Sequence, residues 1–164
     1  CSPEMGLKTM TRDEFEGLIV EVTSKIARRE VGPDLAQFLN ATYPADGATF
    51  TAIEQACHAA IAAGWMCSLE AGGIRYGRVI KPSDRTQGFS VDVVQMKDVK
   101  GPHHRHPSGE IDMIMPITPG AKFDGKPKGW HVYGPDSAHY PTVSDGEALV
   151  LYLLPDGKIE FTKR

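Results

Sequence analysis

Five of the six histidines lie within residues 103–139, and three of them crowd into one short motif. In that motif, the order His104-x-His106-x-x-x-Glu110 brings two imidazoles and a carboxylate close together. Residues two apart on a β-strand point to the same face, so His104 and His106 can be directed at one point. The Pro-Ser-Gly turn that follows can reverse the chain and bring Glu110 back beside them. His139, which follows a Gly-Pro turn, is a fourth candidate.

These residue types predict a metal site formed by His104, His106, Glu110 and His139. Imidazoles combined with a carboxylate suit Fe(II), Mn(II), Ni(II) or Zn(II). Such an ion can act as a Lewis acid or lower the pKa of a bound water molecule. Glu110 and His104 are also the candidates for catalytic proton transfer.

The other three histidines have plainer interpretations. His103 is expected on the opposite strand face from the motif, as a surface residue. His131 is either a partner behind the ligands or exposed, and His58 is structural.

Composition limits what the chain can be. With 164 residues and 41% hydrophobic residues, one domain with an ordinary core is expected. The net charge of −3 gives no reason to expect nucleic acid as a partner, and no apolar stretch approaches the roughly 18 residues of a membrane span. The three cysteines are odd in number and lack CxxC spacing, which indicates free thiols in a reducing cytoplasm.

Hydrophobic periodicity is helical up to about residue 70. Thr11–Glu14 is a capping-box pattern, and an apolar helical face that includes Phe15, Leu18 and Val22 follows it. That face is interpreted as core or as a contact between copies in a homo-oligomer. A shorter helix is predicted after Gly32, and a third from about residue 51 to 63.

From Gly72 onward the pattern becomes alternating, with short strands between Gly, Pro and Asp turns. Strands are predicted at 74–80, 89–96, 111–117, 130–133, 148–154 and 159–162. We therefore expect an α+β fold in which N-terminal helices (1–70) pack on a small antiparallel β-barrel (71–164), the two forming one compact unit.

The histidine motif resembles the first motif of the cupin superfamily, and residues 135–139 resemble the second with one residue fewer. A closer resemblance, strongest over residues 64–154, is to the 4-hydroxylaminobenzoate lyase family. It rests on five segments in order, Gly64–Cys67, Gly72–Val79, Gly88–Val94, Gly101–Asp112 and Tyr133–His139. The resemblance implies a cupin-type barrel, a double-stranded β-helix. It also implies the conversion of 4-hydroxylaminobenzoate to protocatechuate and ammonia in nitroaromatic degradation.

The residues can be compared with that chemistry. The overall change adds water and loses ammonia, so it needs no nicotinamide, and no GxGxxG loop follows a strand. Arg75 and Arg78 are the candidates to bind the substrate carboxylate, since guanidinium grips carboxylate with two prongs. They are an odd number apart, so only one can face inward on a regular strand. Trp130, Tyr133 and Tyr140 can supply an aromatic wall.

Two acidic residues, Asp92 and Asp112, lie in strongly apolar strands. A buried carboxylate needs a partner, so one of them is expected to pair with an arginine or to orient a histidine.

Two other functions remain open at this point. One is a different metal-dependent cupin enzyme, such as a ring-cleaving dioxygenase. The other is a non-catalytic cupin module that binds a small aromatic acid. The length of the ordered match favours the lyase, and oxygen consumption would separate it from the dioxygenase.

Overall fold

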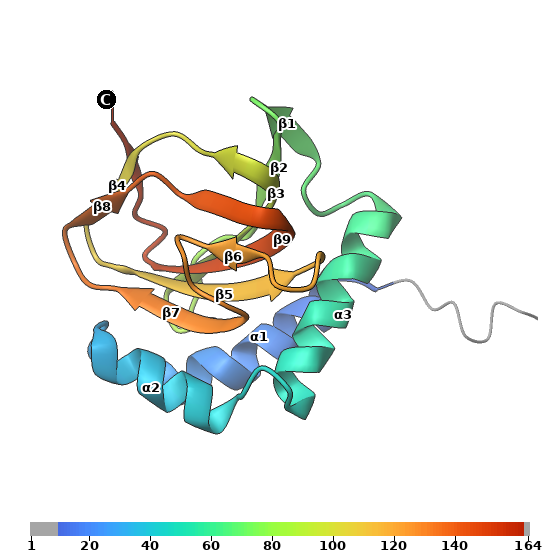
Figure 1. Ribbon diagram of the computed structural model, residues 1–164. Helices are drawn as coiled ribbons and strands as arrows, with labels where there is room; N and C mark the ends of the chain where they lie inside the picture. Colours follow the sequence, from blue (N-terminus) through green and yellow to red (C-terminus); the bar gives the residue numbers. More distant parts are fainter. Residues whose placement is uncertain (1–9, 163–164) are drawn as a thin grey trace, which may run out of the picture.

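The computed structural model describes residues 10–162. Within this range, three helices precede ten strands along the chain (Figure 1). The helices are α1 (Arg12–Ile26), α2 (Pro33–Thr42) and α3 (Ala48–Ala63). The strands are β1 (Leu69–Ala71), β2 (Ile74–Ile80), β3 (Phe89–Lys100), β4 (His104–His106), β5 (Glu110–Pro116), β6 (Lys122–Phe123), β7 (Gly129–Tyr133), β8 (Ser137–His139), β9 (Thr142–Pro155) and β10 (Glu160–Phe161).

Local sequence signals set the helix ends. The predicted capping box is present at the start of α1: the Glu14 amide donates to the Thr11 hydroxyl at 3.1 Å, and the Thr11 amide donates to the Glu14 carboxylate at 3.0 Å. Pro33 opens α2, where its missing N–H costs nothing. Gly64 ends α3 with φ at 92°, a left-handed conformation that glycine adopts without steric cost.

The strands form two antiparallel sheets. The larger has the order β1-β2-β3-β9-β5-β7, with β6 paired to β9, and the smaller has the order β10-β4-β8. Successive strands from β7 to β10 belong alternately to the larger and the smaller sheet, and so do β3, β4 and β5. This alternation is that of a double-sheet jelly roll, the architecture of cupins. The expected α+β class, with helices packed on an antiparallel cupin-type β-structure, is confirmed, although the strands form two sheets rather than a closed barrel.

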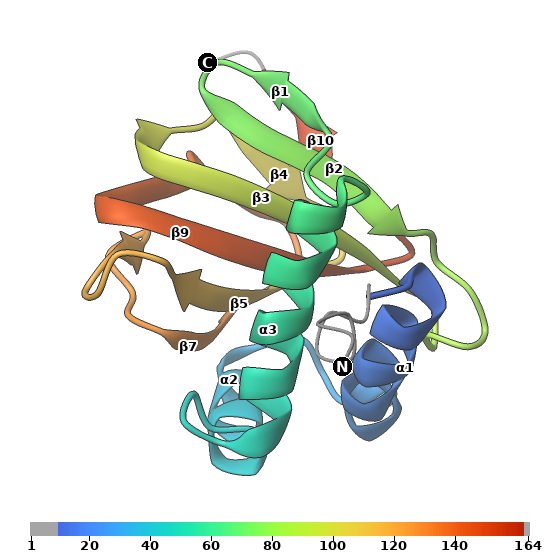
Figure 2. The same cartoon turned by 90° about the vertical axis from the view of Figure 1, so that its right-hand side faces the viewer.

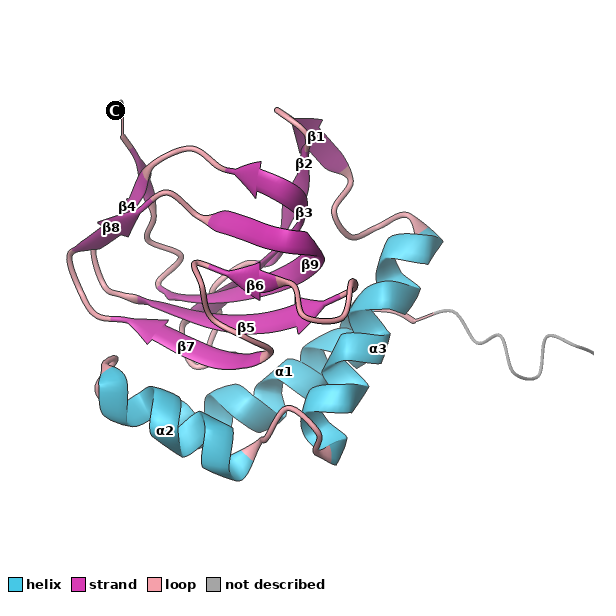
Figure 3. Ribbon diagram, viewed as in Figure 1, coloured by secondary structure: helices cyan, strands magenta, loops and turns pink. Residues whose placement is uncertain are grey.

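The helices cover one face of the larger sheet, and the smaller sheet lies on the opposite side of the larger sheet from the helices (Figures 1 and 3). Turned by 90°, the molecule shows α2 below β7 and α3 crossing in front of the strands of the larger sheet (Figure 2). On the helix side, Phe15 and Val22 belong to the same hydrophobic core as Met113 and Leu151, and Leu18 packs against it. The apolar face of α1 is therefore core.

The opposite face of the larger sheet points to the interior of the jelly roll. Val94, Met96, Val150 and Tyr152 belong to a second hydrophobic cluster there. Both faces are covered over 89–96 of β3 and 148–154 of β9, so most of the first segment and all of the second is buried. The polar side chains that do point into this interior are consequently of interest for function.

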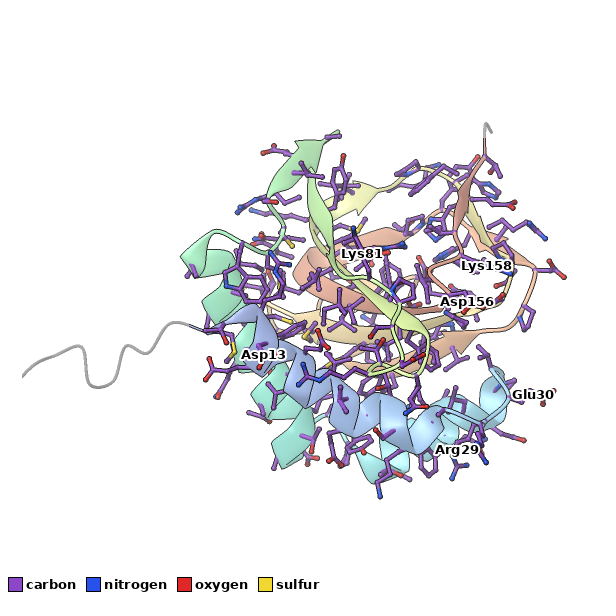
Figure 4. The ribbon with its side chains drawn as sticks, turned by 180° about the vertical axis from the view of Figure 1, so that it is seen from behind. Asp13, Arg29, Glu30, Lys81, Asp156 and Lys158 are labelled. Carbon is purple, nitrogen blue, oxygen red and sulfur yellow. The ribbon has the colours of Figure 1, made fainter. Side chains whose placement is uncertain are left out.

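The part of the outer surface seen in Figure 4 carries charged side chains of both signs. Acidic and basic side chains are intermixed, from Asp13 on α1 to Lys158 between β9 and β10 (Figure 4). No helix within residues 10–162 has the length and apolar character that crossing a bilayer requires.

Candidate metal centre

Four side chains from both sheets converge between them. One ligand atom from each of His104, His106, Glu110 and His139 lies within 4.8 Å of the other three. The two histidines of β4 share a strand face, and His104 is directly opposite His139 of β8. Glu110 begins β5 in the larger sheet, immediately after Gly109 at φ 92°. The smaller sheet thus supplies the imidazoles and the larger sheet supplies the carboxylate.

All three imidazoles turn their Nε2 atoms toward this centre. The Nε2 atoms of His104 and His106 lie 3.3 and 3.0 Å from Oε1 of Glu110. Nε2 of His139 lies 3.6 Å from Oε2 of Glu110 and 3.0 Å from Nε2 of His104. His104, His106 and Glu110 are buried, and the side chain of His139 is 10% exposed.

The donor atoms fit a divalent cation. Within the described chain, Nε2 of His106 and Oε2 of Glu110 are buried without a hydrogen-bond partner. Leaving such atoms unsatisfied costs about 1–3 kcal/mol each, and a cation between them would satisfy both. Three imidazole nitrogens and one carboxylate form a donor set suited to borderline divalent metals.

Further hydrogen bonds fix the protonation of two imidazoles. The hydroxyl of Ser137 donates its only proton to the carbonyl of Gly134 at 2.6 Å, so it accepts from Nδ1 of His106 at 2.8 Å. Asp124 Oδ2 lies 2.5 Å from Nδ1 of His139, and an ionised carboxylate only accepts. In the neutral form, both His106 and His139 therefore present a lone pair at Nε2, as a metal ligand must.

Asp124 is held by two further donors. The hydroxyl of Tyr133 donates to Oδ2 at 2.6 Å and the amide of Thr142 donates to Oδ1 at 2.8 Å. Burial alone would raise the pKa of Asp124, but the hydrogen bonds from His139 and Tyr133 bring it below its usual value. The residue was missed in the sequence because it sits in an Asp-Gly pair, which reads as a turn.

The charges of the centre follow from the same contacts. Burial opposes ionisation of Glu110, but the three histidines lower its pKa well below the usual value. Burial also disfavours charge on His139, yet Asp124 and Glu110 raise its pKa to about 9. Asp112, two residues beyond Glu110 on the same face, has a pKa well above its usual value because of burial and the Glu110 charge. These contacts therefore favour the ionised form of Glu110 and the neutral form of Asp112.

Of the two acidic residues in apolar strands, Asp92 pairs with an arginine. Arg78 donates from Nε to Oδ1 of Asp92 at 2.8 Å and from Nη2 to Oδ2 at 3.2 Å, and Nη2 also lies 3.1 Å from the carbonyl of Gly157. The two-pronged geometry expected for a substrate carboxylate is therefore used within the protein. Arg75 is exposed and lies on the opposite face of β2 from Ile74.

Two of the aromatic residues predicted for the substrate pocket lie on opposite faces of β7. Tyr133 packs beside the centre, with its ring centroid 4.4 Å from that of His139 and 5.5 Å from that of His106. Trp130, three residues away on the same strand, faces the helices instead. Its indole N–H donates to the carbonyl of Tyr43 at 2.9 Å, and its ring contacts Phe50. The structure thus corrects the placement of Trp130 in a substrate pocket, because an odd spacing on a strand puts it on the other face.

The remaining histidines lie outside the centre. His103 contacts the ring of Tyr140 and the hydroxyl of Thr162. His131 packs edge-on against Tyr133, behind the ligands, and His58 is exposed on α3.

A cavity of about 470 Å³ opens beside the centre, between the two sheets, with His104 in its wall. Most of the wall is apolar or aromatic and comes from β2, β3, β9, β10 and the turn between β9 and β10, including Ile74, Tyr76, Met96, Tyr152, Ile159 and Phe161. Its volume lies within the range of small-molecule pockets. Tyr152 was missed in the sequence, although its parity with Val150 and Leu154 places a hydroxyl on an inward position of an apolar strand.

The jelly roll and its centre define a cupin-type protein with a three-histidine, one-glutamate site compatible with a divalent metal ion. A family model described as PnbB, 4-hydroxylaminobenzoate lyase, matches residues 17–161. The chain therefore belongs to the 4-hydroxylaminobenzoate lyase family and is a lyase.

Two relatives and one solved structure illustrate the range of similarity. The 4-hydroxylaminobenzoate lyase of Pseudomonas putida is 30% identical over 168 residues, covering 92% of this chain and 95% of that protein. The 4-hydroxylaminobenzoate lyase of Nocardioides sp. (strain LMS-CY) is 32% identical over 148 residues, covering 84% and 87%. The crystal structure of DMSP lyase DddQ from Ruegeria pomeroyi DSS-3 is 22% identical, covers 93% of this chain and 98% of that one, and has a TM-score of 0.41, too low to bear on chemistry.

Proposed function

We propose that this protein converts 4-hydroxylaminobenzoate to protocatechuate and ammonia, with a divalent metal ion held by His104, His106, Glu110 and His139. The observation that carries the proposal is the convergence of these four donors beside an apolar cavity, in a chain of this family. The three-nitrogen, one-oxygen donor set is suited to Fe, Mn, Ni or Zn.

The reaction balances without an external oxidant. The substrate gains one water and loses one ammonia. The N–O bond, the ring C–N bond and one neighbouring ring C–H bond break, and a C–O bond forms at each of those two ring carbons, so the ring ends with two hydroxyl groups. A metal ion bound at the centre would supply Lewis acidity toward an oxygen atom. The residues of the chain must therefore bind the ring, exclude bulk water and move protons.

Each of these tasks has a group in position. Aromatic and aliphatic side chains of the cavity wall can pack against the benzene ring, which also keeps water away from it. Proton transfer is assigned to His104, which lines the cavity and whose Nδ1 has no hydrogen-bond partner within the described chain, and to Glu110, which keeps a second carboxylate oxygen when one binds a metal. Tyr133 is assigned to the part of the substrate site next to the metal centre, since its ring packs on His106 and His139.

The test combines metal analysis of the purified protein with an assay on 4-hydroxylaminobenzoate under strictly anaerobic conditions. The proposal expects about one equivalent of a divalent metal per chain and stoichiometric protocatechuate and ammonia without oxygen. Turnover that requires oxygen would instead identify a dioxygenase. Tight binding of the acid with no turnover, with or without metal, would identify a binding module.

We also propose that the protein works in a reducing compartment such as the cytoplasm. Support comes from Cys57 and Cys67, both buried and both free. Mass spectrometry of protein purified without reductant should find both as thiols, and a disulfide in either would contradict this assignment.

A further inference from the structure

The cavity beside the metal centre has one cationic side chain other than histidine. Among the residues of its wall, all within the described range, Lys100 alone is a lysine or arginine, and none is acidic. The cavity therefore combines an apolar wall with a positive charge, which is the combination that an aromatic anion requires.

The charge of Lys100 is not neutralised within the described chain. Between residues 10 and 162, no carboxylate forms an ion pair with Lys100. Ion pairs are found there for other cationic side chains, namely Arg78, Arg85, Arg105, Lys122 and Lys128. Its ammonium group lies instead 4.5 Å from the ring centroid of Tyr140. A cation over an aromatic face is held in place without losing its charge, so it can still attract an anion.

The position of Lys100 is set by the sheet. Lys100 ends β3 and pairs with Thr142 at the start of β9, just beyond Pro141 of the cavity wall. A register shift between Lys97 and Val99 accompanies a positive φ at Asp98. Such a bulge re-aims the side chains that follow it. His104 lies four residues further on and lines the same cavity.

We propose, on the basis of the function proposed above, that Lys100 binds the carboxylate of 4-hydroxylaminobenzoate and so directs the para hydroxylamino group toward His104 and the metal centre. Arg78 cannot take this part while its guanidinium binds Asp92 and the Gly157 carbonyl. Arg75 lies on the other face of β2 from the cavity residues Ile74 and Tyr76. Lys100 is thus a specificity-determining residue for aromatic acids over neutral analogues.

The test uses the metal-loaded protein and two inert probes, 4-aminobenzoate and its neutral analogue 4-aminobenzamide. Calorimetric titration gives the Kd of each probe for the wild type and for Lys100→Met, which keeps the chain length without the charge. Lys97→Met is the matched control, since Lys97, like Lys100, is an exposed lysine of β3, but it does not line the cavity. Lys100→Arg restores a cation.

Lys100→Met should raise the Kd of 4-aminobenzoate by about tenfold to a hundredfold, the range for losing a hydrogen bond to a charged group. The amide should bind all variants equally, and Lys97→Met and Lys100→Arg should stay close to wild type. On 4-hydroxylaminobenzoate, the same loss should appear in KM, with kcat little changed. Unchanged binding of the acid by Lys100→Met overturns the inference, and so does an equal loss of both probes, which would mean that Lys100 only shapes the cavity.

The outcome separates this inference from the function on which it rests. If the wild type binds 4-aminobenzoate in a Lys100-dependent way but does not turn over the hydroxylamino acid, the reaction is wrong and the carboxylate site stands. If both KM and kcat for the hydroxylamino acid are unchanged in Lys100→Met, the reaction stands and the carboxylate site is wrong.

Discussion

Asp124 offers a sharp test of how the metal centre is built, because it touches no proposed metal position. Its carboxylate accepts from Nδ1 of His139 at 2.5 Å, the hydroxyl of Tyr133 at 2.6 Å and the amide of Thr142 at 2.8 Å. In Asp124→Asn, one oxygen becomes an amide donor. If the remaining oxygen keeps the Thr142 amide, the new NH₂ group faces His139 and Tyr133.

The two neighbours can respond differently. The hydroxyl of Tyr133 can rotate and accept, but His139 can accept at Nδ1 only by moving its proton to Nε2, where a metal must bind. Losing a partner behind a metal-binding histidine typically lowers metal affinity by 10- to 100-fold, which is about 1.4–2.8 kcal/mol. We expect that weakening for Asp124→Asn, with the fold retained.

Competition between the protein and a chelator of known affinity, with Zn(II) or Mn(II), measures this directly, and circular dichroism checks the fold. Asp136→Asn is the matched control. Asp136 is a mostly exposed carboxylate three residues before His139 that pairs with Arg105 on the surface, so its variant should bind metal as the wild type does. Equal metal affinity of Asp124→Asn and wild type would refute the reasoning that Asp124 sets the proton on His139.

Three further outcomes are expected. His106→Ala should lose metal while keeping its far-ultraviolet circular dichroism spectrum, and a variant that still binds one equivalent would exclude His106 as a ligand. Gly109→Ala should be clearly less stable to urea than Gly120→Ala. Both glycines have positive φ, but only a Cβ at Gly109 would meet atoms closer than 3.0 Å. Equal losses of stability in the two variants would show that the contacts around Gly109 relax freely. Arg78→Met should lower stability by about 1 kcal/mol by leaving Asp92 unpartnered. It should not change the preference for 4-aminobenzoate over its amide, and a changed preference would return Arg78 to the substrate site.

The parts of the structure that follow from local rules could be predicted from the sequence. The capping box at Thr11 and the left-handed stop at Gly64 depend on residues within a turn of each other. The convergence of His104 and His106 depends only on the two-residue repeat of a strand, and the turn before Glu110 on three neighbouring residues. These features did not require knowing where the rest of the chain lies.

The orienting and substrate-facing residues depend on long-range pairing and could not be predicted. The Asp124-Gly125 pair has the same local appearance as Asp145-Gly146 and Asp156-Gly157, and only the pairing of β6 with β9 brings it to His139. The strand predicted at 89–96 stopped before Lys100, and only the folded sheet brings this residue to the cavity. The sequence analysis placed Trp130 and Tyr133 in one aromatic wall, although their odd spacing on a strand puts them on opposite faces. The sequence also does not say which of those faces the helices cover.

The two arginines show a subtler limit. Strand parity indicated that only one of Arg75 and Arg78 could face inward, and Arg78 does share the strand face of Ile74 and Tyr76. What parity cannot reveal is whether an inward cation is already neutralised by the neighbouring strand. The β2–β3 register places Asp92 directly opposite Arg78, so the strand alternation that puts Arg78 on the face of Ile74 also gives it a partner, and its side chain remains 35% exposed.

The division of the ligands between the two sheets makes the centre depend on the assembled fold. His104 and His139 are direct neighbours across β4 and β8, where opposite side chains lie about 5 Å apart, so the smaller sheet alone can bring these imidazoles together. Glu110 arrives from the larger sheet through the turn at Gly109, and Asp124 from the segment before β7. Without that carboxylate, the three imidazoles would lack the negative charge that a divalent cation requires beside them in a buried site. The metal-binding geometry is therefore completed only when the two sheets of the jelly roll face each other, and a bound ion would in turn hold them together.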